Sequence, residues 1–305
     1  MTPGLPADVV LRAPRYRHFY GLVHQYIGTG QIAAGSLNNP DSFQIDQDAD
    51  FIERATGAEF SSLTGGELKA QFEIVPGELL QQFPMYVNSL GSGQLPKWWP
   101  QAGRLGGKRI PRGCIYKSTV DDRQAVATAS TLRLAHYGFK AFATPIVGPM
   151  AYQSAEPFRY GVDYTTEGVG ALGANATNPQ PVNVGIDADF EIYKLIILCD
   201  GPGTIDIISS SAFGNHAWFN RTFSLALLGA TEIDADPSAG EWPFRLADLA
   251  GPVWIPGGGA IQVTVADTSG ATNRVQVILE GLKLKPAMGI NIDPAVLAHA
   301  LQLAA

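Results

Sequence analysis

Paired aspartates recur in this chain and are the residues best suited to binding a divalent cation. Asp48 and Asp50 lie two positions apart, and Asp187 and Asp189 repeat the arrangement. A strand places residues i and i+2 on one face, where two carboxylates could bind Ca²⁺. No acidic loop of the EF-hand type surrounds either pair. We therefore favour a solvated or hydrogen-bonded strand edge, with alternate residues of 186–190 facing inward. A calcium site is the alternative, and no cofactor is expected.

Histidine, the side chain most often used as a general base, occurs five times: His18, His24, His136, His216 and His299. None of them lies at a metal-binding spacing or beside a nucleophile motif such as G-x-S-x-G or H-E-x-x-H. We therefore interpret the histidines as structural side chains and expect no enzymatic activity. A catalytic triad assembled in space is the alternative.

A short basic stretch contrasts with the acidity of the whole chain. Positions 104–117 hold five basic residues and no acid, in a protein whose net charge is −7. The five are Arg104, Lys108, Arg109, Arg112 and Lys117. Two interpretations stay open, a loop that docks on an acidic protein surface and a solvated glycine-rich loop.

Adjacent tryptophans, Trp98 and Trp99, could form a platform on which a sugar stacks. The dipeptide Trp99-Pro100 recurs as Trp242-Pro243, however. A structural corner shared by two parts of the chain explains this recurrence better than a lectin-like site does.

Composition excludes several classes of protein. The chain has 305 residues, of which 46% are hydrophobic and only 16% are charged, whereas about a quarter is usual for a soluble domain. The acidic isoelectric point, near 5.2, argues against nucleic-acid binding. The sequence shows no signal peptide and no apolar run long enough to span a membrane. Cys114 and Cys199 read as small core residues.

One repeat organises the whole chain, with copies about 140 residues apart. The matching pairs are Asn39-Pro40 with Asn178-Pro179, Asp48–Phe51 with Asp187–Phe190, and Ile110-Pro111 with Ile255-Pro256. A period of this size indicates a duplicated domain. We predict an N-terminal arm at 1–14, a first domain at 15–145, its duplicate at 155–285, and a tail at 286–305.

The local pattern within each copy is that of β-structure. Residues 261–265 and 275–277 alternate with a period of two and are joined by turn-forming residues, which predicts a hairpin. The apolar run 193–199 predicts a strand buried on both faces. A helical insertion is expected at 66–82. The expected fold is all-β, with two tandem, similar antiparallel β-sandwich domains of jelly-roll type and a short C-terminal helix.

The C-terminal helix is expected to begin at Asp293, a good N-cap, with Pro294 in its first turn. Its apolar face includes Val296, Leu297 and Leu301. A segment this short does not stand alone, so we expect it to dock on its own chain or on a neighbour.

Three segments of the second copy carry a family resemblance: 186–190, 255–265 and 275–283. They resemble small jelly-roll virion proteins of tailed bacteriophages, which decorate or cement capsids or build the neck and baseplate. The resemblance implies a jelly-roll fold and a place in the virion, after synthesis in the host cytoplasm. It implies no catalytic residues.

Scarcity of charge, together with the duplication, predicts a protein that assembles with copies of itself. We expect a non-enzymatic virion structural protein that decorates or stabilises a capsid, with other virion proteins such as a major capsid protein as partners. Three chains with two similar units each would suit a quasi-sixfold position on a shell, so a trimer is favoured. A neck or baseplate component and a carbohydrate- or receptor-binding module are the alternatives.

Overall fold

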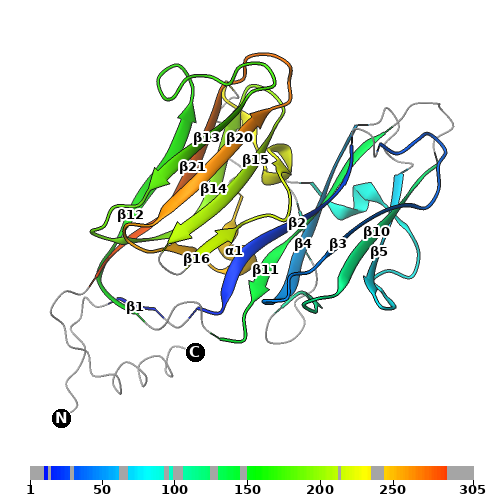
Figure 1. Cartoon of the computed structure of the whole chain (residues 1–305), viewed down its shortest axis with the longest axis horizontal. Coiled ribbons are helices and arrows are strands. Elements are labelled where there is room, and N and C mark those ends of the chain that lie inside the picture. Colours follow the sequence, from blue (N-terminus) through cyan, green and yellow to red (C-terminus); the bar gives the residue numbers. More distant parts are fainter. Residues whose placement is uncertain are drawn as a thin grey trace, which may run out of the picture.

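The protein is built almost entirely from β-strands, as the sequence predicts (Figure 1). The computed structural model describes residues 10–12, 15–27, 31–61, 68–92, 96–98, 106–123, 130–144, 150–211, 214–234 and 244–286. Four sheets form two sandwiches, and all the long strand pairs are antiparallel. No helix of this described part is long and apolar enough to cross a membrane.

The first sandwich has two sheets. One has the order β2-β11-β4, with two short strands on the far side of β4. Its strands are β2 (Arg17–Tyr26), β11 (Thr131–Ala141), β4 (Asp50–Ser61), β8 (Lys97–Trp98) and β9 (Lys108–Ile110). The facing sheet has the order β3-β10-β5, with two short strands beyond β5. Its strands are β3 (Asn39–Gln44), β10 (Ile115–Asp122), β5 (Leu68–Val75), β6 (Glu78–Leu79) and β7 (Met85–Tyr86).

The second sandwich repeats this order. One sheet runs β12-β21-β14 and the other β13-β20-β15. The first contains β12 (Met150–Tyr164), β21 (Val275–Pro286), β14 (Asp189–Cys199), β18 (Thr231–Glu232) and β19 (Val253–Ile255), and β1 (Val10–Arg12) adds to its edge. The second contains β13 (Thr177–Asn183), β20 (Ala260–Asp267), β15 (Gly203–Ser211), β16 (Gly214–Ala217) and β17 (Phe223–Ser224).

Most successive long strands of each sandwich alternate between its two sheets, but β5 and β10, like β15 and β20, lie side by side in one sheet. This order is the winding of a jelly roll. The described residues also form three short helical turns: η3 (Val87–Leu90), η4 (Ala226–Leu228) and α1 (Leu246–Ala250). The limits of the two domains stay a prediction, and β12 begins at Met150, ahead of the expected start at 155.

A β-bulge beside a glycine occurs at the same place in both sandwiches. The pairing of β11 with β4 shifts between Tyr137 and Gly138, and the pairing of β14 with β21 shifts opposite Gly281. A Cβ atom on Gly138 would collide with the carbonyl oxygen of Ile52, and one on Gly281 would collide with that of Glu191. Only glycine allows the backbones to approach this closely.

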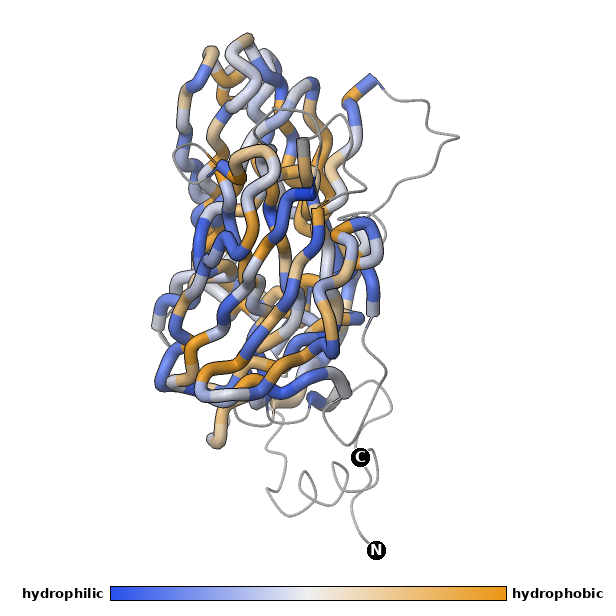
Figure 2. The backbone as a smooth tube through the Cα atoms, turned by 90° about the vertical axis from the view of Figure 1, so that its right-hand side faces the viewer, coloured by the Kyte–Doolittle hydropathy of each residue, from blue (hydrophilic) through white to orange (hydrophobic). Residues whose placement is uncertain are grey.

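The core of each sandwich follows from alternation along its strands, in which hydrophobic and hydrophilic residues take turns (Figure 2). In β5 the buried residues are Leu68, Ala70, Phe72 and Ile74, and the residues between them are partly exposed. They pack against β10, where Tyr116 and Val120 are fully buried. Period-two burial therefore places these residues between the two sheets.

Two local expectations are wrong. The expected helical insertion at 66–82 contains strand β5 instead, because the period-two alternation of its apolar residues suits a half-buried strand. The expected hairpin at 261–277 does not form, since β20 and β21 belong to different sheets and their connection crosses the sandwich. The strand expected at 193–199 is present within β14, but only Leu195–Ile197 are buried, and the residues on either side are partly exposed. The C-terminal helix, with Val296, Leu297 and Leu301, lies outside the described residues.

Substitution of Gly281 by alanine should destabilise the second sandwich. The new Cβ atom would overlap the carbonyl oxygen of Glu191, a backbone atom that cannot move without breaking the ladder. We expect a loss of about 3 kcal/mol in the free energy of unfolding, measured by urea denaturation. Gly173→Ala is the matched control, because its Cβ would meet only the Ala176 side chain at 3.8 Å. Equal stability of the two variants would contradict this account of the bulge.

Candidate assembly surface

The β2-β11-β4 sheet of the first sandwich is buried on both faces. One face packs within its own sandwich, and the other packs against the second sandwich. Seven apolar residues of this second face are each at most 1% exposed: Phe19, Val23, Ile52, Ala55, Ala135, Tyr137 and Phe139. They form one continuous core with residues of the second sandwich, so the junction between the two sandwiches is dry and permanent.

The segment between β16 and β17 covers the open edge of β2. The amide of Gly21 donates to the carbonyl of Trp218 (2.8 Å), and the carbonyl of Gly21 accepts from the amide of Asn220 (3.1 Å). The Asn220 side chain also accepts from the amide of Val23 (2.9 Å). A side chain at Gly21 would meet the rings of Phe219 and Phe223, so glycine lets the segment lie flat on the strand. An exposed strand edge is thereby removed.

Aromatic rings and one buried hydroxyl fix the junction further. The ring of Phe19 makes edge-to-face contacts with Trp218, Phe219 and Phe244, at centroid distances of 5.9–6.1 Å. The Tyr137 hydroxyl donates to the carbonyl of Leu227 at 2.6 Å. Burial raises the pKa of Tyr137 far above its ordinary value, so the hydroxyl stays a donor.

A polar network lies inside the first sandwich and reaches the junction. His136 contacts Glu53 through Nδ1 (2.8 Å), and Tyr116 donates to the same carboxylate (3.1 Å). All three side chains are fully buried. Nearby, His24 lies 3.4 Å from Asp41, which also accepts from Arg221 of the second sandwich (3.0 Å). His24 and His136 therefore lie in the interior of the first sandwich.

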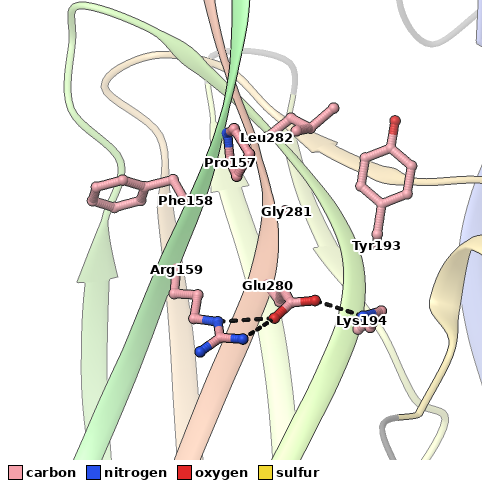
Figure 3. Close-up of a pocket in the computed structure, with 8 residues that line it drawn as sticks. All are labelled: Pro157, Phe158, Arg159, Tyr193, Lys194, Glu280, Gly281 and Leu282. Atoms are coloured by element: carbon pink, nitrogen blue, oxygen red, sulfur yellow. Dashed lines mark hydrogen bonds and ion pairs between the residues drawn. The ribbon is translucent and has the colours of Figure 1, made fainter.

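The equivalent face of the second sandwich is open. Strands β12, β14 and β21 carry a groove of about 820 Å³, lined by Pro157, Phe158, Arg159, Tyr193, Lys194, Glu280, Gly281 and Leu282 (Figure 3). Glu280 bridges Arg159 (2.8 Å) and Lys194 (2.6 Å) across the floor. Hydrogen bonds from Lys194 and Arg159 lower the pKa of Glu280, which keeps this carboxylate ionised and unsuited to act as a general acid.

Exposed apolar side chains gather in the first sandwich, on the segment that joins β5 to η3. Leu79 is 57% exposed, Phe83 59%, Met85 37% and Tyr86 50%. A cluster of this kind is typical of a contact surface for another protein.

The paired aspartates bond to their own chain. Asp50 accepts from Arg109 (2.8 Å) and from the amide of Arg112 (3.0 Å), and Asp48 lies 3.4 Å from Lys140. Asp189, at the position in β14 that Asp50 has in β4, is buried and accepts from the Tyr152 hydroxyl and the Gly257 amide, each at 2.7 Å. The described residues hold no group of three potential metal ligands, and the calcium site stays a prediction.

Ile186 corrects the expected orientation of 186–190. Its side chain is 90% exposed, whereas Ala188 and Phe190 are buried as expected. Asp187 is exposed, but Asp189 is buried rather than solvated. The turn that precedes β14 breaks the alternation, so the pattern holds only from Ala188 onward.

Most of the basic stretch forms ion pairs within the chain. Lys108 contacts Glu78, Arg109 contacts Asp50, and Lys117 lies 3.8 Å from Glu73. Arg112 lines a small pocket of about 350 Å³ beside Asp50, and Arg104 lies outside the described residues. Docking of this stretch on an acidic partner stays a prediction.

The groove and the exposed segment were not foreseen from the sequence. Leu79–Tyr86 and its counterpart Ala217–Ser224 have no identical residue at equivalent positions. The two segments could have been matched only by continuing the alignment of the two copies through a region that has no identical residues. Of the two tryptophans of the suggested sugar platform, Trp98 is 44% exposed and lies in β8, where it pairs with Ala55 of β4. Trp99 lies outside the described residues.

Comparisons with known proteins find fold-level likeness only. No family model and no curated protein matches the chain. Among solved structures, the major capsid protein of bacteriophage PM2 is similar, with 11% identity, coverage of 90% of this chain and 100% of that one, and a TM-score of 0.26. N-glycanase F (PNGase F) has 14% identity, coverage of 87% and 96%, and a TM-score of 0.23. A turret protein of Sulfolobus turreted icosahedral virus has 13% identity, coverage of 90% and 98%, and a TM-score of 0.17. These scores are low, so the function is argued from the chain's own geometry.

Acid should weaken the core of the first sandwich and the junction. Burial lowers the pKa of His18 to about 3 and that of His24 to about 4, whereas both groups titrate near 6.5 when unfolded. The unfolded chain therefore binds more protons than the folded chain below pH 6.5, and stability falls as the pH falls from 7 to 5. We expect a loss of about 2 kcal/mol per histidine over this range, measured by urea denaturation at each pH.

His24→Gln is the variant that tests this assignment. Its free energy of unfolding should depend less steeply on pH than that of the wild type. A wild-type stability that does not change between pH 7 and pH 5 would contradict the prediction.

Proposed function

We propose that this chain is a non-enzymatic structural protein of a virus shell that works as an oligomer. The observation that carries the proposal is the pair of jelly rolls with one strand order, fused by a dry junction. Two similar units held rigidly in one chain are a building block for a repeating surface, because each unit can make the same kind of contact with its neighbours.

The surface of the protein supports an assembly role. The groove on β12, β14 and β21 and the apolar segment Leu79–Tyr86 are both open, while their counterparts at the junction are covered. Three acid–base side chains agree with this role, because Glu53 and His136 are buried in a core and Glu280 is held in ion pairs. None of these three side chains is placed to act as a general acid or base on a substrate.

Three chains are the oligomer that the duplication favours. Six similar jelly rolls would then surround one axis, a geometry suited to a quasi-sixfold position on a shell. Copies of the same chain, and other virion proteins such as a major capsid protein, are the partners proposed. Decoration of a bacteriophage capsid and a place in the neck or baseplate are the two locations considered.

Sedimentation velocity at micromolar concentration tests the oligomer. We expect a species with three times the mass of the 32.5 kDa chain, because a trimer closes a ring of six similar units. A monomer that persists at this concentration would contradict the proposal.

Quantitative mass spectrometry of purified virus particles tests the location. A structural role in the shell predicts that the chain copurifies with particles in a fixed ratio to the other shell proteins. A ratio comparable to that of the most abundant shell protein indicates decoration of the capsid, and a ratio far below it indicates the neck or baseplate. Absence from the particles would contradict a virion role.

A further inference from the structure

The segment Leu79–Tyr86 of the first sandwich is the positional counterpart of Ala217–Ser224 in the second. Leu79 pairs with Glu73 of β5, and Met85 pairs with Ala70, three residues back along the same strand. In the second sandwich Ala217 pairs with Ile208 of β15, and Phe223 pairs with Ile205, again three residues back. Five residues lie between the two pairings in each case. The two segments therefore occupy equivalent places.

Only one of the two segments is covered. In the second sandwich Trp218 and Phe223 are fully buried, because the segment lies on the edge of β2 and against the apolar face of its sheet. In the first sandwich Leu79, Phe83 and Tyr86 are each at least 50% exposed. The described part of the chain supplies no strand edge to the exposed segment.

The counterpart of the β2 edge is also open. Tyr20 pairs with the bulge glycine Gly138, and Phe158 pairs with the bulge glycine Gly281. The next residues, Gly21 and Arg159, therefore occupy equivalent positions in β2 and β12. The edge of β2 at Gly21 binds Trp218 and Asn220. On β12, described residues bond to the backbone beside Met150–Tyr152, through β1, and at Asp163, whose carbonyl accepts from the amide of Val169, and Arg159 lies between these two places.

We propose that Leu79–Tyr86 of one chain docks on the β12 edge and the adjoining groove of a second copy of this chain. The contact would reproduce between chains the junction that exists within each chain, and it rests on the proposed function. Arg159 would exchange backbone hydrogen bonds with Leu80 and Gln82, as Gly21 does with Trp218 and Asn220. Gln82 has the same side-chain amide as Asn220, which accepts from the strand amide two residues further on.

Side-chain size is complementary on the two sides of the proposed contact. Within the chain a glycine, Gly21, faces two phenylalanine rings. Between chains Arg159 replaces the glycine, and the residues opposite it would be Gln81 and Met85, which lack those rings. The groove also differs in polarity, because Arg159, Glu280 and Lys194 replace an apolar face. Such a surface tolerates water before assembly, as a contact between separate chains requires.

The contact is head-to-tail, since a different surface of each chain takes part, and this makes it testable by mixing. Each variant is made with Cys114→Ser and Cys199→Ser, which remove the two native thiols. One chain carries Gln82→Cys and the other carries Arg159→Cys. A short bis-maleimide should join the two chains when they are mixed and should join neither chain to itself. Glu167→Cys, on an exposed turn beyond β12, is the matched control for Arg159→Cys.

Charge placed on the segment provides a second measurement. Leu79→Glu with Phe83→Glu should weaken the oligomer at least tenfold while leaving the thermal unfolding temperature of the chain unchanged, because both side chains are exposed. Ile186→Glu, at the most exposed of the large apolar residues described, should leave the oligomer intact.

The outcomes separate this inference from the proposed function. An oligomer that forms normally, without a link between positions 82 and 159 and without weakening by the glutamates, would overturn the proposed contact and leave the shell role standing. The absence of any oligomer in the wild type would overturn both. Equal cross-linking of Arg159→Cys and Glu167→Cys would also overturn the contact, because it would show random collision.

Discussion

Burial of both faces of the β2-β11-β4 sheet is the constraint on which the rest of the structure depends. Each strand must supply apolar residues to two cores at once, so Phe19 faces the second sandwich while Leu22 faces its own. A sheet of this kind cannot be solvated on either side without a large loss of buried apolar area. The second sandwich is therefore an obligatory cover for the first, and the two units keep one fixed arrangement.

The edges of the two sandwiches explain why a permanent junction can coexist with an open surface. The edge of β2 is closed by backbone bonds from Trp218 and Asn220, which removes it as a template for unwanted pairing. At Arg159 no described strand pairs with the edge of β12, which lies there beside the ion pairs of Arg159, Glu280 and Lys194. Charged groups beside an open edge discourage indiscriminate pairing.

Low charge content has a physical explanation in this arrangement. The faces that a single sandwich would present to water are turned inward at the junction, where Tyr137 and Phe139 replace the polar residues of an ordinary outer face. In the second sandwich the equivalent positions carry Glu280 and Leu282, which line an open groove. The same fold thus carries two different outer faces, because only one of them is covered within the chain.

The sequence predicted the fold class and the repeat, but it did not predict how the sandwiches contact each other. Short motifs such as Asn39-Pro40 and Asn178-Pro179 lie on the equivalent strands β3 and β13, each opposite a valine and a threonine of the neighbouring strand. The segments 79–86 and 217–224 have diverged completely, because one is exposed and the other is buried. Turn-forming residues at 267–273 suit a hairpin and a crossing between sheets equally well, so local pattern could not place β20 and β21.

Determination of the assembled oligomer by electron cryomicroscopy tests the central claim most directly. We predict that Leu79–Tyr86 of a neighbouring chain lies along the β12 edge. When the second sandwich, with this bound segment, is superposed on the first sandwich, the segment should coincide with Ala217–Ser224 on β2. A two-fold dimer in which this segment stays in solvent, or two sandwiches that separate within a chain, would contradict it.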